Sequence, residues 1–181
     1  MSEKFKTYNL SAAYFVTLTI VKWINVFEND AYKNIVIESI KYYQQFRGLT
    51  LHAYCIMPNH LHLIAKSDGT EPLSLILRDL KKFTSIKIVD MLKADNCDHS
   101  QKMLSVFENE GMRLRRISNY KVWKDGNMPI ELISNKYFDT KMDYIHRNPV
   151  KAGLVEYEEE YLFSSARNYS ELPAVLDIEF P

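Results

Sequence analysis

The stretch that decides the fold is Met57-Pro58-Asn59-His60-Leu61-His62-Leu63-Ile64. It follows an apolar run at residues 53–57, and Pro58-Asn59 is a turn pair, so the pattern predicts a hairpin of two strands at 51–57 and 60–66. Side chains alternate between the two faces of a strand, so His60 and His62 project to the same side. Two imidazoles on one strand face can bind a divalent metal, although they could also form an ordinary polar strand face.

The segments around this hairpin alternate between strand and helix patterns. Residues 14–21 are β-branched and aromatic, which predicts a strand. Helical spacing of apolar residues predicts further helices. These expected helices lie at residues 30–46, 72–92, 103–116 and 135–147, with a short strand at 120–123 and a helix end at Asn148-Pro149.

The order strand, helix, strand, strand, helix, strand predicts an α+β, ferredoxin-like sandwich with an antiparallel sheet. Its central strands are expected to be either the second and third or the first and third. We expect residues 1–181 to form a single domain, with a core at about 8–150 and a C-terminal extension at about 151–181.

The composition excludes several classes of protein. The chain has 181 residues and two cysteines, Cys55 and Cys97, without a CxxC pair. This excludes a disulfide framework and a four-cysteine zinc site, and it fits a reducing cytosol. The first six residues lack the apolar stretch of a signal peptide, and no apolar run has the length of a membrane span, so we expect no membrane association.

The net charge is zero, but the charges are unevenly distributed along the chain. Residues 1–126 carry 18 lysines and arginines against 13 acidic residues, whereas residues 127–181 carry 5 against 10. Basic clusters could follow a phosphate backbone, or they could be solvated helix surface. The cluster residues are Lys81, Lys82, Arg113, Arg115, Arg116, Lys121 and Lys124.

The last predicted helix carries residues suited to phosphate chemistry. Tyr144 and Asn148 are four residues apart, so they lie on one helix face. A tyrosine hydroxyl can attack phosphorus to form a covalent phosphotyrosine, and an amide oxygen suits Mg²⁺ or Mn²⁺. Tyr144 could instead be a core aromatic, and Asn148 a helix cap. His146, two residues from Tyr144, is expected to point away from this face toward the surface or toward DNA.

Several segments resemble a known family. Residues 57–62 resemble the HUH motif (His, hydrophobic, His) of single-tyrosine transposases. The block Asp143-Tyr144-Ile145-His146-Arg147-Asn148-Pro149, continued to Val155, resembles the tyrosine-helix block of REP-associated tyrosine transposases. Residues 122–126 and 161–169 also resemble that group. The ordered set is specific, whereas an HxH pair alone is common.

This resemblance implies an HUH nuclease domain that cuts and rejoins hairpin-flanked single-stranded DNA through a 5′-phosphotyrosine intermediate. It implies that Tyr144 is the nucleophile and that His60, His62 and Asn148 bind Mg²⁺ or Mn²⁺. Arg147 and His146 would join the basic residues in contacting DNA. The resemblance further implies a bacterial cytoplasmic protein, associated with the nucleoid when bound to DNA, that is a monomer or a homodimer.

Two alternatives remain open at this point. The chain could be a domesticated relative that binds hairpin DNA without cutting it. It could also be a metallohydrolase that uses His60, His62 and His146 and does not bind DNA, although the helical position of His146 argues against this.

Overall fold

The computed structural model describes residues 9–10, 12–113, 120–127 and 129–181. Its sheet is antiparallel, with the strand order β2-β3-β1-β4. The strands are β1 (Tyr14–Thr19), β2 (Leu49–Met57), β3 (His60–Ser67) and β4 (Ile130–Glu131). The central strands are therefore the first and third. The α+β, ferredoxin-like arrangement expected from the order of elements is confirmed.

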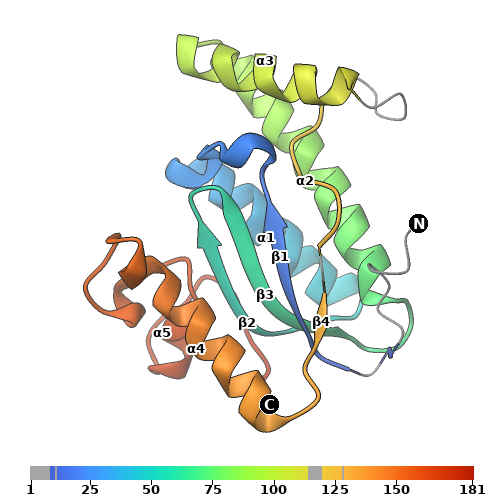
Figure 1. Ribbon diagram of the computed structural model, residues 1–181, viewed down its shortest axis with the longest axis vertical. Helices are drawn as coiled ribbons and strands as arrows, with labels where there is room; N and C mark the ends of the chain where they lie inside the picture. The colour runs from blue at the N-terminus through green and yellow to red at the C-terminus, as the bar shows by residue number, and fades with distance from the viewer. Residues whose placement is uncertain (1–8, 11, 114–119, 128) are drawn as a thin grey trace.

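Helices cover both faces of the sheet. Figure 1 shows α1 and α2 on one face and α4 on the other, with α3 packed across the end of α2. The helices are α1 (Asp30–Phe46), α2 (Leu73–Asp95), α3 (Asp98–Met112), α4 (Asn135–Lys151) and α5 (Ala166–Tyr169). Three short 3-10 helices are η2 (Val21–Trp23), η3 (Val26–Glu28) and η4 (Glu158–Glu160). No helix in these described ranges is long and apolar enough to cross a membrane.

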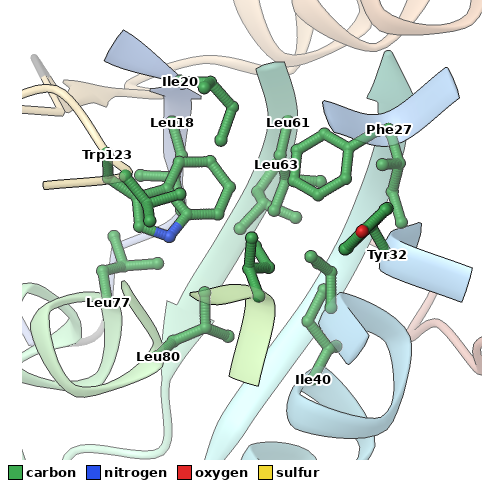
Figure 2. Packing of buried hydrophobic residues seen from close by; sticks show 14 of the residues in the cluster. Leu18, Ile20, Phe27, Tyr32, Ile40, Leu61, Leu63, Leu77, Leu80 and Trp123 are labelled. Carbon is green, nitrogen blue, oxygen red and sulfur yellow. The ribbon is translucent and has the colours of Figure 1, made fainter. Parts of the chain in front are cut away.

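Strand β3 divides its side chains between two cores. Leu61 and Leu63 face α1 and α2 in the larger core, which Figure 2 shows from close by. Ile64 faces α4 in a smaller core. His60 and His62 alternate with these leucines, so they fall on the α4 side of the sheet.

Helix α4 is held over this second face by a cap and by apolar contacts. The Ser134 side chain accepts a hydrogen bond from the Tyr137 backbone N–H at the helix start. Phe138 and Ile145, two turns apart, are buried against Phe15 and neighbouring strand residues. This packing fixes the rotation of α4, so that Tyr144 faces the sheet beside the histidines.

Two sequence predictions near the end of the chain are wrong. The expected strand at residues 120–123 is only an isolated bridge between Trp123 and Ile20, and the fourth strand lies later, at β4. Asn148-Pro149 does not end α4, which continues to Lys151. Pro149 lies in the last turn and is buried, so its missing N–H removes only one bond near a helix end.

The C-terminal segment lies along the outer edge of β2. The Ile56 N–H donates to the Phe163 carbonyl at 2.9 Å, and the Glu179 N–H donates to the Leu51 carbonyl at 2.8 Å. The Ser165 N–H donates to the carbonyl of a third β2 residue, Tyr54. The segment thereby satisfies backbone groups that an exposed edge strand would leave open.

Candidate metal and tyrosine site

Three predicted site residues come together on the α4 side of the sheet. The ring centroids of His60 and His62 are 4.6 Å apart, and those of His62 and Tyr144 are 5.3 Å apart. Phe15, from the neighbouring strand β1, contacts both residues. Its ring centroid is 5.5 Å from that of His62 and 5.9 Å from that of Tyr144. These residues come from three elements of the chain, β1, β3 and α4.

Each histidine is oriented by a neighbour through Nδ1. Thr17 Oγ1 lies 2.9 Å from His62 Nδ1, because Thr17 and His62 face each other in the register of β1 and β3. Asn59 Oδ1 lies 2.8 Å from His60 Nδ1, and the Asn59 amide nitrogen donates to Asn25 Oδ1. With a proton on Nδ1, each ring keeps its lone pair on Nε2, which is the arrangement of a metal-ligating histidine.

The charge state of these rings also suits a metal ligand. Burial lowers the pKa of His62 to about 3, with smaller contributions from His60 and the Lys141 ammonium. Burial also lowers the pKa of His60. Both imidazoles are therefore neutral near pH 7, and neutral imidazole is the form that binds a metal.

One buried atom of the site has the chemistry of a metal ligand. His62 is only 3% exposed, and its Nε2 has no hydrogen-bond partner among the described residues. A buried polar atom without a partner is unfavourable, and such atoms in native proteins often face an ion or water. The two histidines therefore fit a divalent cation that is coordinated by imidazole nitrogens.

Asn148, the third predicted metal ligand, lies on α4 with Tyr144. Its amide nitrogen donates to the Tyr144 carbonyl at 2.6 Å, one helical turn away, which leaves Oδ1 as the free acceptor of that amide. Within the described ranges, no cluster of three His, Cys, Asp or Glu side chains could hold a metal. An amide oxygen is a ligand of the type that suits Mg²⁺ or Mn²⁺.

Two lysines that the sequence reasoning did not select flank the tyrosine. Lys141 Nζ lies 5.9 Å and Lys151 Nζ 5.7 Å from the centroid of the Tyr144 ring. They give the open side of the site a positive charge that suits a phosphate. The signal was present in the sequence, since Lys141 precedes Tyr144 by three residues and so shares its helix face. Thr17 and Asn59 were missed because their roles depend on strand register and turn geometry.

The structure places the predicted DNA-binding residues in different surroundings. Lys82 is exposed on α2. Arg113 pairs with Glu110 at 3.0 Å, and Arg147 pairs with Glu158 at 3.3 Å. Both arginines are exposed, so these ion pairs leave their guanidinium groups accessible. Arg115 and Arg116 lie outside the described residues.

The remaining basic candidates gather near one end of the sheet. Lys81 is partly buried, and its ammonium donates to the Lys124 carbonyl at 2.6 Å. Lys121 pairs with Asp125 at 2.6 Å. The Lys124 ammonium lies 4.3 Å from the centroid of the Trp23 ring. Lys81 therefore braces the chain beside β1, Lys121 is paired with a carboxylate, and the Lys124 ammonium lies over an exposed ring without a carboxylate partner in the described part of the chain.

The expected surface position of His146 is wrong. His146 is buried, and its Nε2 lies 2.8 Å from Ser165 Oγ, on the side of α4 away from Tyr144. It therefore reaches neither DNA nor a metal shared with the two strand histidines. This position contradicts the metallohydrolase alternative, which required His146 at the metal.

Comparisons with known proteins identify a family and a similar fold. The family described as "Transposase IS200 like" matches residues 11–120, a range that includes both site histidines and ends before Tyr144. No curated protein matches the sequence. A solved structure described as "Structure of the REP associates tyrosine transposase bound to a REP hairpin" is similar, with a TM-score of 0.66 and 20% sequence identity. The match covers 99% of this chain and 94% of that chain, and at this identity it shows a shared fold.

Proposed function

The chain belongs to the IS200-like transposase family, and from this premise we propose that it is a metal-dependent endonuclease and strand transferase acting on single-stranded DNA. The observation that carries the proposal is the position of Tyr144, whose ring centroid lies 5.3 Å from that of His62, a buried residue whose Nε2 has no partner among the described residues. The proposed nucleophile and a proposed metal ligand thus have neighbouring rings on the α4 side of the sheet.

In the proposed reaction, the Tyr144 hydroxyl oxygen attacks a DNA phosphorus. The new bond joins this oxygen to phosphorus, the bond from phosphorus to the 3′ oxygen breaks, and the phenolic proton is balanced by the proton gained by that 3′ oxygen. The products are a 5′-phosphotyrosine and a free 3′-hydroxyl. Attack of a 3′-hydroxyl on the phosphotyrosine reverses the step and rejoins DNA without an external energy source.

The other site residues hold and orient the reacting groups. His60, His62 and Asn148 would hold Mg²⁺ or Mn²⁺, which polarises phosphoryl oxygens when it is bound. Lys141 and Lys151 would offset the phosphate charge beside the tyrosine. Because Phe15 packs below the Tyr144 ring, the phenol is held in place before DNA binds.

Hairpin DNA is the substrate class that we propose. The similar structure is described as bound to a REP hairpin, and it covers nearly the whole of this chain. The proposed site is complete within one chain, since Tyr144 meets the histidines of its own subunit. A monomer would therefore suffice for cleavage.

The test uses end-labelled hairpin DNA taken from the sequence flanking the gene for this chain, incubated with Mn²⁺ and resolved on a denaturing gel. We expect a covalent protein–DNA band that disappears with EDTA and with Tyr144→Phe. Tyr137→Phe is the matched control, because Tyr137 lies on the same helix, also near Lys141, but outside the histidine contacts. This control should keep the band.

Two other outcomes would change the conclusion. A hairpin shift on a native gel without a covalent band would indicate a catalytically silent hairpin-binding protein. Neither binding nor adduct, across all flanking hairpins, would reject the DNA function altogether.

A further inference from the structure

Trp23 is an exposed tryptophan that packing does not explain. Its side chain is 54% exposed, although it belongs to the short helix η2 at the end of β1. Most of the other tryptophan, Trp123, lies in the core, where its indole N–H donates to Thr84. Burial in the core therefore explains a tryptophan at position 123, whereas it does not explain one at position 23.

The backbone at Trp23 is held in an unfavourable conformation. Lys22 and Trp23 have φ angles of 53° and 57°, so two successive residues with a Cβ adopt the left-handed region. The turn is fastened on both sides, because Val21 N–H donates to the Val122 carbonyl and Trp23 N–H donates to the Ile20 carbonyl. Strained conformations held in this way cluster at functional sites.

This tryptophan adjoins the metal and tyrosine site. The centroids of Trp23 and His60 are 6.0 Å apart, and His60 is in turn 4.6 Å from His62. The aromatic rings of Trp23, His60, His62 and Tyr144 therefore form one continuous row. A phosphate bound between Tyr144 and the histidines would place a neighbouring nucleotide near Trp23.

A cavity of about 360 Å³ adjoins Trp23. It is lined by Trp23, Lys124 and residues of two ion pairs, Lys22 with Glu110 and Lys121 with Asp125. Lys124 is the lysine of this lining without a carboxylate partner among the described residues, and its ammonium lies over the indole. An exposed aromatic face beside an available cation is the combination that binds an unpaired base and its phosphate.

We propose that Trp23 and Lys124 form a subsite for one unpaired nucleotide of single-stranded DNA next to the cleaved phosphate. The base stacks on the indole, and the Lys124 ammonium moves from the ring to the phosphate of that nucleotide. The subsite rests on the proposed function, since it locates the DNA that the tyrosine cuts. It selects for an unpaired strand, because a base within a duplex has no free face for the indole.

The test measures binding separately from cleavage. Fluorescein-labelled hairpins with unpaired flanks are titrated with wild type, Trp23→Ala, Trp23→Phe and Tyr42→Ala, and anisotropy gives Kd. The same hairpins then carry one abasic residue at each flank position in turn. Tyr42, on α1, is the matched control because it is 52% exposed and lies on the far side of the sheet.

The subsite predicts a specific pattern of affinities. Trp23→Ala should weaken binding on the order of tenfold, Trp23→Phe should retain most of the affinity, and Tyr42→Ala should match wild type. One abasic position should weaken wild-type binding and have no further effect on Trp23→Ala. Affinity for Mn²⁺, measured by calorimetry without DNA, should be the same in Trp23→Ala and wild type.

Three results would overturn the subsite. Equal DNA affinities for Trp23→Ala and Tyr42→Ala, with Tyr144-dependent adducts intact, would reject the subsite and leave the proposed function standing. If Trp23→Ala bound Mn²⁺ more weakly than wild type but responded to the abasic positions as wild type does, Trp23 would only shield His60. Failure of wild type to bind any hairpin would reject both the subsite and the proposed function.

Discussion

His146 Nε2 lies 2.8 Å from Ser165 Oγ, and this contact joins the helix that carries Tyr144 to the C-terminal segment. Ser165 Oγ also accepts from the Tyr54 N–H at 2.9 Å and donates to the Tyr54 carbonyl at 3.2 Å. The serine hydroxyl has one proton, so a neutral His146 that donates from Nε2 satisfies all three contacts. Burial, slightly opposed by Asp143, lowers the pKa of His146 to about 4, which agrees with the neutral form.

The first prediction concerns this contact. His146→Ala removes a buried hydrogen bond and the ring contact with Tyr169, so the free energy of unfolding should fall by about 1–3 kcal/mol. Urea denaturation measures the change, with His99→Ala as the control because His99 is exposed on α3. Adduct formation should also slow at a temperature where the variant remains folded, since α4 loses its hydrogen bond to the C-terminal segment. Equal stability of the two variants would contradict this role.

The second prediction concerns the orientation of His62. Thr17→Val keeps the volume of the side chain but removes the hydroxyl partner of His62 Nδ1, so the affinity for Mn²⁺ should fall about 10- to 100-fold. Calorimetry with Mn²⁺ measures the loss. Thr140→Val is the control, since the Thr140 hydroxyl donates to the carbonyl of Lys136 in its own helix. Unchanged Mn²⁺ affinity in Thr17→Val would show that Thr17 does not support the ligand.

The third prediction concerns the cations beside Tyr144. Lys141→Gln and Lys151→Gln should each weaken hairpin binding. Each should also make the negative slope of log affinity against log salt shallower by about one. Lys136→Gln is the control, because Lys136 is exposed near the start of the same helix. A slope that changes equally in all three variants would mean that the charge of α4 acts as a whole.

The fourth prediction concerns Lys81, whose ammonium donates to the Lys124 carbonyl and to Asn127 Oδ1. Burial lowers the pKa of Lys81 from 10.5 to about 8 in the folded protein. Between these two pH values the unfolded chain binds more protons than the folded chain, so rising pH favours folding. The stability of wild type relative to Lys81→Met should therefore rise from pH 8 to 10.5, by up to about 3 kcal/mol.

Urea denaturation at several pH values checks this sign. Below pH 8, Lys81 is charged in both states, so the stability difference between wild type and Lys81→Met should be constant there. Parallel stability curves from pH 8 to 10.5 would show that Lys81 titrates normally and is solvated in the folded protein.

Local patterns were enough to predict most of the fold. The β-branched run at residues 14–21 and the turn at Pro58-Asn59 correspond to β1 and to the β2–β3 hairpin. The apolar spacing after Pro72 corresponds to α2, which begins at Leu73. Strand β4 was misplaced because two paired residues leave almost no alternation to detect, whereas the apolar Val122-Trp123 pair imitates a strand.

The candidate site was predicted in part. The period of two along a strand placed His60 and His62 on one face, and their rings are neighbours in the structure. Spacing on the helix correctly separated His146 from Tyr144, but it could not show that His146 is buried. That burial depends on Ser165, nineteen residues later, which the C-terminal segment brings against β2.

The sequence by itself determined which residues share a face, because helix and strand periods are local properties of the chain. Only the tertiary structure decided which faces meet. The packing of Phe138 and Ile145 on the sheet sets the rotation of α4 and so brings Tyr144 to His62. In the same way, the register of β1 against β3 brings the Thr17 hydroxyl to His62 Nδ1. These contacts join segments far apart in the chain, and their geometry follows from burying two apolar surfaces together, which no local pattern specifies.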